Sequence, residues 1–287
     1  MHKSKRVAFV IPLDTTRHLR YVKNLAYLAS DFSDVFVVLS RSSDLILVEP
    51  HLTPEIRTLV LTDWITEDSL LIAERRRSVP TFKKWIALQR LIESFDAKNR
   101  YEYCVCCDSE IRVLRPIDAE FVAALPSQFV FVGDHLSSHA SYDNYRKILL
   151  DATTRSQSAN ESSSCVGRLM TWWSGLPIYS TETLPDFLGL VGAQDAMSLA
   201  KSLKWEAFDH MTYQRYAVSR HINGAVFVCL SHDTRTPTGW SLEDVATDIV
   251  YAASRKAGLA TLWATRKTME RISELSNYAY IEYHMDH

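Results

Sequence analysis

Short apolar runs alternate with amphipathic segments along the first half of the chain. Nearly continuous apolar runs are typical of strands buried on both faces of a sheet, and they occupy residues 6–12, 35–39, 57–62 and 101–107. Apolar positions at helical spacing predict an amphipathic helix over residues 19–30. A second helix is expected after Pro80, because the apolar residues of 85–92 share one face and proline suits a first helical turn. This alternation predicts an α/β fold with a mainly parallel central sheet and right-handed crossovers.

The second half of the chain has a less regular pattern. It predicts strands at 129–133, 176–179, 225–230 and 278–283, helices at 142–153, 197–203, 208–218 and 241–256, and a further helix in the tail from 260. The polar, serine-rich segment 155–167 lacks large apolar residues and predicts a mobile surface loop. A loop of this length is either a lid over a site or a disordered segment, and both alternatives stay open.

Composition and charge narrow the class of protein. The 287 residues carry a net charge of −2, which gives no electrostatic footprint for nucleic acid. No apolar stretch is long enough to span a membrane, while peripheral association with a membrane stays open. The basic start is followed by only a short apolar run, 7–13, that contains Pro12, which favours a first strand over a signal peptide. We therefore expect a cytoplasmic protein, and the sequence leaves its oligomeric state undetermined.

The cysteines do not form a metal-binding pattern. Cys104, Cys106 and Cys107 fall within one predicted strand, and the remaining two, Cys165 and Cys229, are isolated. Zinc sites usually combine two loop-borne pairs with C-x₂-C spacing, whereas these clustered cysteines lie in a predicted strand and no second pair is present. We interpret the three clustered cysteines as small apolar residues of a core strand, in a reducing compartment.

Candidate chemistry begins where the fourth predicted strand ends. Residues 101–107 run directly into Asp108-Ser109-Glu110, and ligands of open α/β sheets bind beyond the carboxyl ends of strands. Two carboxylates at i and i+2 can be directed at one point if the backbone turns there. Oxygen ligands of this kind suit a hard cation, so Asp108 and Glu110 are candidate ligands for Mn²⁺ or Mg²⁺.

The strand, its D-x-E element and the lysine-bearing helix before it resemble the GT-A glycosyltransferases that use nucleotide sugars. The segment KKWIALQRLIESFDAKNRYEYCVCCDSEIRVLRPID follows their layout, although the third motif position is Glu rather than the commoner Asp. The resemblance implies one GT-A-like, Rossmann-like domain over 1–287. Its nucleotide-binding half would cover about 1–135 and its acceptor-binding half about 136–287.

On the donor side, the resemblance implies that Asp108, Ser109 and Glu110 contact the metal and the nucleotide of a UDP- or GDP-sugar. A basic residue of the preceding helix would reach the donor phosphate or sugar. Lys83 and Lys84 are both candidates, but successive helical positions lie about 100° apart, so only one can face the site; we assign Lys84. The turn after the first strand would hold the base and ribose through Pro12, Asp14, Thr15 and Arg17.

On the acceptor side, the resemblance points to Trp172, Trp173 and Gly175, where aromatic faces stack on a sugar and glycine permits close approach. In an inverting reaction a carboxylate beside the acceptor removes the hydroxyl proton. Asp209 is preferred slightly over Glu206 for this catalytic role, although Asp209 is also a good helix N-cap.

A third metal ligand is often a histidine from a late strand end in these enzymes. His232 follows the strand predicted at 225–230, and Asp233 beside it would orient the imidazole. The alternative is an ordinary histidine in a surface loop.

These observations predict a metal-dependent glycosyltransferase that moves a sugar from a nucleoside-diphosphate sugar to a glycan or another hydroxyl acceptor. Two rivals remain. A nucleotidyltransferase of sugar phosphates shares the layered scaffold, but it carries a glycine-rich, basic segment after the first strand, which this chain lacks. A non-catalytic binding protein with the same scaffold is the other.

Overall fold

The structure, a computed structural model, describes residues 6–95, 97–125, 128–132, 142–156, 169–170, 178–220, 225–229 and 281–283. Its centre is a five-stranded sheet in the order β3-β2-β1-β4-β8. The strands are β1 (Val7–Pro12), β2 (Ser33–Leu39), β3 (Ile56–Val60), β4 (Tyr103–Cys106) and β8 (Ile178–Ser180). Four strands are parallel, and β8 pairs antiparallel with β4 at one edge. The predicted mixed, mainly parallel α/β sheet is confirmed.

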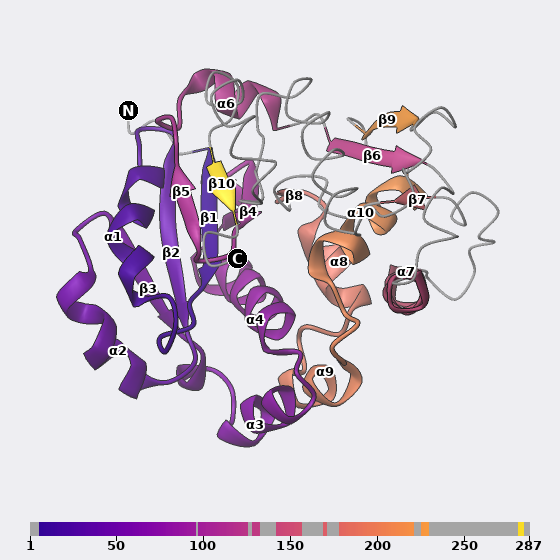
Figure 1. Ribbon diagram of the computed structural model, residues 1–287, viewed down its shortest axis with the longest axis horizontal. Helices are drawn as coiled ribbons and strands as arrows, with labels where there is room; N and C mark the ends of the chain where they lie inside the picture. The colour runs from indigo at the N-terminus through magenta and orange to yellow at the C-terminus, as the bar shows by residue number, and fades with distance from the viewer. Residues whose placement is uncertain are drawn as a thin grey trace, which may run out of the picture.

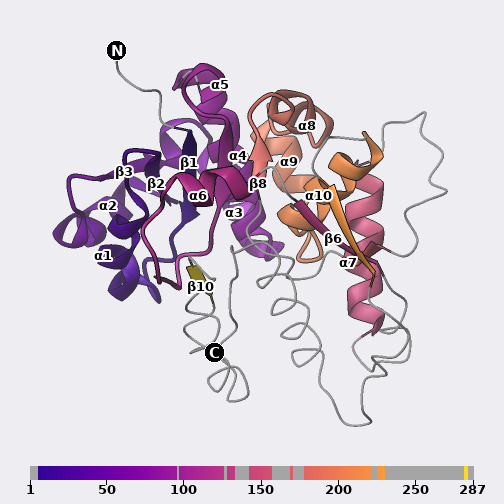
Figure 2. The ribbon, with the colours of Figure 1, turned by 90° about the horizontal axis from the view of Figure 1, so that it is seen from above.

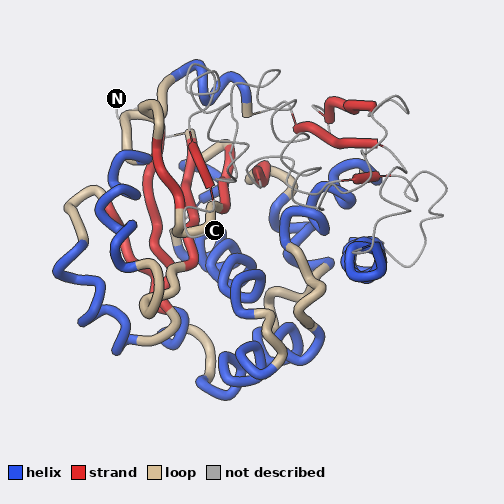
Figure 3. The backbone as a smooth tube through the Cα atoms, viewed as in Figure 1, coloured by secondary structure: helices blue, strands red, loops and turns tan. Residues whose placement is uncertain are grey.

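Each face of this sheet is covered by helices (Figures 1 and 3). One core contains Val10, Val38 and Cys106 together with residues of α3, α4, α8, α9 and α10. The other contains Phe9, Val37 and residues of α1, α2 and α6. Because successive strand residues point to opposite faces, a strand covered on both sides must be apolar throughout, which explains the continuous apolar runs.

Helices α7, α9 and α10 begin within one residue of their predicted starts, whereas the helix predicted over 19–30 is not regular. The bounds of the helices are α1 (Val22–Leu25), α2 (Ser42–Val48), α3 (Glu67–Arg75), α4 (Val79–Ser94), α5 (Ala97–Arg100), α6 (Ala119–Ala124), α7 (Tyr142–Ser156), α8 (Leu184–Leu190), α9 (Ala196–Ser202) and α10 (Asp209–Ser219). The helix expected over 19–30 is instead a short α1 between two 3₁₀ turns, Leu19–Tyr21 and Ala26–Leu28. Helix α7 continues to Ser156, so the first two residues of the predicted 155–167 loop are helical. Residues 157–167 lie outside the described part of the chain.

Two small sheets accompany the central one. Strands β6 (Gln128–Val132), β7 (Leu169–Met170) and β9 (Ala225–Cys229) form a sheet in the order β7-β6-β9. Strands β5 (Ile111–Val113) and β10 (Ile281–Tyr283) pair antiparallel. Figure 2 shows β6 and α7 on the side of the molecule away from β1, β2 and β3. No helix in the described residues is long and apolar enough to cross a membrane, and the helix predicted at 241–256 lies outside them.

Cys104, Cys106 and Cys107 are fully buried in the core, as the sequence predicted. Burial raises the pKa of Cys104 to about 12 and holds that of Cys106 well above its usual value. Neither thiol is therefore ionised near neutral pH, and both act as small apolar groups in the core.

An aromatic cluster joins the sheet to the second half of the chain. Phe187 of α8 is fully buried, and its ring centroid lies 5.8 Å from that of Trp85, 5.1 Å from Tyr213 and 5.3 Å from Tyr216. These contacts connect α4, α8 and α10. The packing of α10 against α4, which places the residues considered next, depends on this cluster.

Replacing Phe187 with alanine should lower the free energy of unfolding by about 3–5 kcal/mol, because a large cavity opens among the rings of Trp85, Tyr213 and Tyr216. Urea denaturation followed by circular dichroism measures this change. The matched control is Tyr27→Ala, which removes an aromatic ring that is 69% exposed and should change stability by about 0.5 kcal/mol or less. Equal effects of the two substitutions would contradict the assigned role of the cluster.

Candidate functional site

The carboxyl ends of β1 and β4 meet at one edge of the sheet, because the two strands are adjacent and parallel. The loop after β1, residues 13–18, and the turn after β4, residues 107–110, therefore lie against each other. The His18 ring joins them: Nδ1 lies 2.7 Å from Oγ of Ser109, and Nε2 lies 2.8 Å from Oε2 of Glu110. Sheet topology thus brings the predicted nucleoside loop beside the predicted D-x-E element.

Lys84 reaches the same place from α4. Its Nζ lies 3.2 Å from Oδ1 of Asp108 and donates a hydrogen bond of 3.1 Å to Oδ1 of Asp209. The side chains of Lys84 and Asp209 are only 6% and 4% exposed, whereas that of Asp108 is 40% exposed. The ammonium group therefore bridges one buried carboxylate and one that faces solvent.

The second carboxylate oxygen of Asp209 is also occupied. The hydroxyl of Tyr179, in β8, donates a hydrogen bond of 2.9 Å to Oδ2. Burial, followed by the charge of Asp209, holds the pKa of Tyr179 well above its usual value, so the phenol stays protonated and remains a donor. Burial alone would lower the pKa of Lys84, but the charges of Asp108 and Asp209 outweigh it and the pKa is raised. Lys84 is consequently a permanent cation at this edge.

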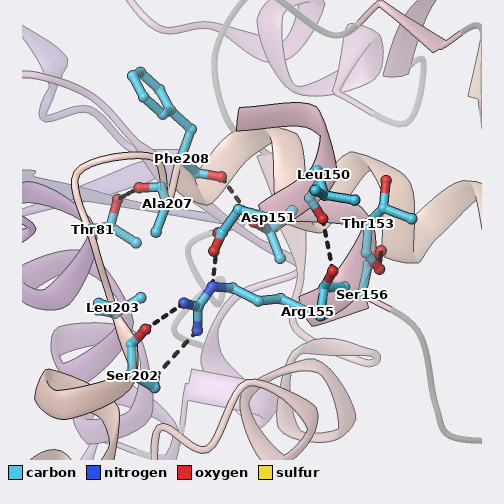
Figure 4. A network of polar contacts seen from close by, with 12 residues as sticks. Thr81, Leu150, Asp151, Thr153, Arg155, Ser156, Ser202, Leu203, Ala207 and Phe208 are labelled. Atoms are coloured by element: carbon cyan, nitrogen blue, oxygen red, sulfur yellow. Dashed lines mark hydrogen bonds and ion pairs between the residues drawn. The ribbon is translucent and has the colours of Figure 1, made fainter. Parts of the chain in front are cut away.

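Asp209 is held in place by the segment that precedes it. Thr81 of α4 donates a hydrogen bond of 2.6 Å from Oγ1 to the carbonyl of Ala207. Arg155 of α7 donates to Ser202 and to Asp151, as Figure 4 shows.

A further arginine holds the same segment. Arg76 donates from Nε to the carbonyl of Leu203 at 2.6 Å. Three elements thus fix the backbone that leads into α10, and Asp209 is the first residue of that helix.

Lys83 fixes the neighbouring loop. Its Nζ donates a hydrogen bond of 2.8 Å to the carbonyl of Leu13. Both lysines are about 5% exposed, so neither is an ordinary solvated side chain. Burial lowers the pKa of Lys83 to about 8, although the negative charges of Asp44 and Asp14 act in the opposite direction. Lys84 is the one that contacts the D-x-E element, as assigned from the sequence.

The remaining residues of the loop form a compact turn. Asp14 accepts hydrogen bonds from the backbone N–H and the hydroxyl of Thr16. Burial acts to raise the pKa of Asp14, but the Thr16 hydrogen bonds and the nearby His18 and Lys83 lower it below its usual value. The hydroxyl of Thr15 donates to Asp44 at 3.4 Å. The loop is therefore closed by its own polar groups, with Asp14 ionised near neutral pH.

Three other residues that the sequence predicted for the site differ in how far they are buried. Pro12 is the half-buried last residue of β1, and Arg17 is exposed on the loop. Glu206 lies in the turn before α10, half-buried, and within the described residues its Oε2 is buried without a hydrogen-bond partner. Trp172, Trp173, Gly175 and His232 lie outside the described part of the chain.

The carboxylates at the carboxyl ends of β1 and β4 suit a metal ion that is coordinated partly by the protein and partly by a bound ligand. Among the described residues, no group of three histidine, cysteine or acidic side chains forms a ready metal cage. Mg²⁺ in particular is usually bound by one or two carboxylates, with substrate phosphates and waters completing its coordination. The exposed Asp108 carboxylate fits that mode, and Lys84 beside it supplies a second positive charge for a phosphate.

The structure places two residues at the site, His18 and Tyr179, that no sequence pattern indicated. His18 directly follows the predicted nucleoside loop. It meets Ser109 and Glu110 because β1 and β4 are adjacent, and that adjacency is known only from the structure. Tyr179 lies in a predicted strand, where an aromatic residue is ordinarily a core residue. Nothing local in the sequence indicates that its hydroxyl binds Asp209.

No protein-family model matches the chain, and no curated protein matches its sequence. The chemistry of the site therefore has to be argued from the arrangement of Asp108, Lys84, Asp209 and their neighbours. That arrangement combines an accessible carboxylate, a fixed cation and a turn at the carboxyl edge of a parallel sheet. It is suited to binding an anionic ligand together with a metal ion.

Replacing Lys84 with methionine should lower the free energy of unfolding by about 3–5 kcal/mol, because Asp209 is left buried without its counter-charge. The double variant Lys84→Met/Asp209→Asn should recover much of this loss, since it removes the buried charge and keeps an oxygen acceptor for Tyr179. Chemical denaturation of the wild type, both single variants and the double variant gives the coupling energy. A double variant that is less stable than Lys84→Met would contradict the assignment.

Lys83 should make a distinct contribution to the pH dependence of stability. Its folded-state pKa of about 8 lies below the ordinary value of 10.5, so between these values the unfolded chain binds more protons than the folded one. The contribution of Lys83 to the free energy of unfolding should therefore increase as the pH rises from about 8 to 10.5. Denaturation curves of wild type and Lys83→Met across this range measure the difference, which should grow in favour of the wild type as pH increases.

Proposed function

We propose that this protein is a metal-dependent glycosyltransferase that transfers a sugar from a nucleoside-diphosphate sugar to a hydroxyl acceptor. The observation that carries the proposal is the meeting of Asp108, Lys84 and Asp209 at the carboxyl edge of β1 and β4. Residues chosen separately on the GT-A resemblance lie within hydrogen-bonding distance of one another there. A mixed, mainly parallel sheet with helices on both faces is also what that resemblance implies.

Asp108 and Glu110 are the residues of this chain that would contact the metal, Mn²⁺ or Mg²⁺. When bound, the cation would neutralise negative charge on the departing diphosphate. Lys84 supplies a second positive charge that is already desolvated and fixed by Asp209, so little reorganisation is needed when the leaving group gains charge. The loop that contains Asp14, Thr15 and Arg17 would hold the nucleoside.

The two candidate bases now have different roles. Both oxygens of Asp209 accept hydrogen bonds, from Lys84 and from Tyr179, and the side chain is 4% exposed. A general base needs an oxygen that can reach the acceptor hydroxyl. We therefore assign Asp209 to positioning Lys84. For an inverting reaction, Glu206 is the remaining candidate base: its Oε2 makes no hydrogen bond within the described residues, although this oxygen is buried and would have to become accessible to the acceptor.

The proposal predicts metal-linked binding of a nucleoside diphosphate. Isothermal titration calorimetry with UDP and with GDP should show binding that strengthens at least tenfold when Mn²⁺ is present. Asp108→Ala should abolish this enhancement while the protein stays folded, because the Asp108 side chain is 40% exposed. Absence of metal-linked binding of either nucleotide by the wild type would overturn the proposal.

The matched control is Asp31→Ala. Asp31 is an exposed carboxylate just before the start of β2, at the opposite edge of the sheet, so its loss removes the same charge from a place that should not bind nucleotide. Its nucleotide binding should equal that of the wild type. An equal loss in both variants would mean that net charge, rather than Asp108, determines binding.

A further inference from the structure

A second polar depression lies away from the Lys84 site. It is a cleft of about 640 Å³ between residues 63–66, helix α4 and the turn that leads from Ala193 into α9. Its volume falls in the range of about 300–1,000 Å³ that is usual for ligand sites. In Figure 1, α3 and α9 lie side by side below α4, which agrees with their direct packing. The cleft is thus built where the two halves of the chain meet.

Helix α4 separates this cleft from the Asp108 edge. Ile86, Gln89, Arg90 and Glu93 line the cleft, and their i, i+3, i+4 and i+7 spacing places them on one face of the helix. At about 100° per residue this face is roughly opposite to the direction of Lys84. The same helix therefore presents one face to the candidate transferase site and another to the cleft.

An arginine and a tryptophan form the centre of the cleft. The guanidinium carbon of Arg90 lies 5.0 Å from the centroid of the Trp64 ring, and both residues line the cleft. Within the described residues, Nε of Arg90 is buried and has no hydrogen-bond partner. Since this atom is closed off from the cleft, a ligand would pair with the other N–H donors of the Arg90 guanidinium, which has five in all and therefore suits a ligand that brings acceptor oxygens.

The charges of the lining exclude an anionic ligand. Asp63, Glu93 and Asp195 contribute three negative charges and Arg90 one positive charge, which leaves a net charge of −2. A phosphate or a carboxylate would be repelled by this surface. The acceptor oxygens that Arg90 favours must therefore belong to a neutral group, such as a hydroxyl.

Amide groups supply further hydrogen bonds. Gln89 donates from Nε2 to Oε1 of Glu93 at 2.6 Å, and its own Oε1 can accept a hydrogen bond from a ligand. The exposed Gln194 lies on the opposite wall. Planar polar groups around a tryptophan suit a molecule that has both hydroxyl groups and an apolar C–H surface, because an aromatic ring has a large apolar surface and a polar edge.

We propose that this cleft binds a neutral oligosaccharide, through hydroxyl contacts to Arg90, Gln89 and Gln194 and through apolar contact with Trp64. The site is distinct from the proposed nucleotide site at Asp108. It would hold a glycan independently of sugar transfer, so the proposal stands or falls separately from the proposed transferase activity.

The test begins with the full chain on a glycan array that carries neutral and acidic oligosaccharides, followed by calorimetry with cellotetraose, maltotetraose and chitotetraose. We expect at least one neutral glycan to bind, with affinity at least tenfold weaker in Trp64→Ala and in Arg90→Gln. Because Trp64 also packs against the core, Gln194→Ala, a change at an exposed side chain, provides a second variant that should fold normally and bind less tightly.

Two controls separate this site from the nucleotide site. Tyr27→Ala removes an exposed aromatic ring elsewhere and should leave glycan binding unchanged, as should Asp108→Ala. Arg90→Gln and Gln194→Ala should keep the binding of UDP or GDP with Mn²⁺ that the wild type shows. The proposal is overturned by failure of every neutral glycan to bind, by a preference for acidic glycans, or by binding that all three cleft variants retain.

Discussion

The ammonium group of Lys84 is buried between two carboxylates, and the arrangement of the site depends on this interaction. Transfer of an isolated charge from water into a protein interior costs several kcal/mol. Asp209, itself buried, and the half-exposed Asp108 together compensate for that cost. Because removal of Lys84 or of Asp209 leaves a buried charge without its nearest counter-charge, α4 and α10, which supply the two residues, must keep fixed relative positions. The site is thus as rigid as the packing around it.

That packing also explains why Asp108 remains accessible. Lys84 donates a hydrogen bond to the buried Asp209. Asp209 in turn accepts a hydrogen bond from Tyr179 of the antiparallel edge strand β8. The cation does not have to be drawn out of the core to meet a ligand at Asp108. This fixed positive charge next to an accessible carboxylate is the arrangement on which the proposed binding of an anion together with a metal ion rests.

The sequence predicted the sheet better than the helices. Strands β1 to β4 were expected within about two residues, because a strand buried on both faces must be apolar at nearly every position. The helix expected over 19–30 is broken into α1 and two 3₁₀ turns, although its apolar residues pack on one face of the sheet as a continuous helix would. Helices α2, α3, α5, α6 and α8 were not expected, because helices of four to nine residues show too little apolar periodicity to be recognised in a sequence.

The sequence by itself determined the residue types and their places along the chain: apolar runs that must be strands, and Asp108, Glu110, Lys84 and Asp209 as candidates for chemistry. Only the tertiary structure decided which of these meet. Lys84 and Asp209 are separated by 125 positions in the chain, and a contact at that range has no local pattern. For the same reason, His18 and Tyr179 were not recognised until β1, β4 and β8 were seen to be neighbours. Apolar periodicity is a local property, whereas the pairing of buried polar groups is settled only when the chain is folded.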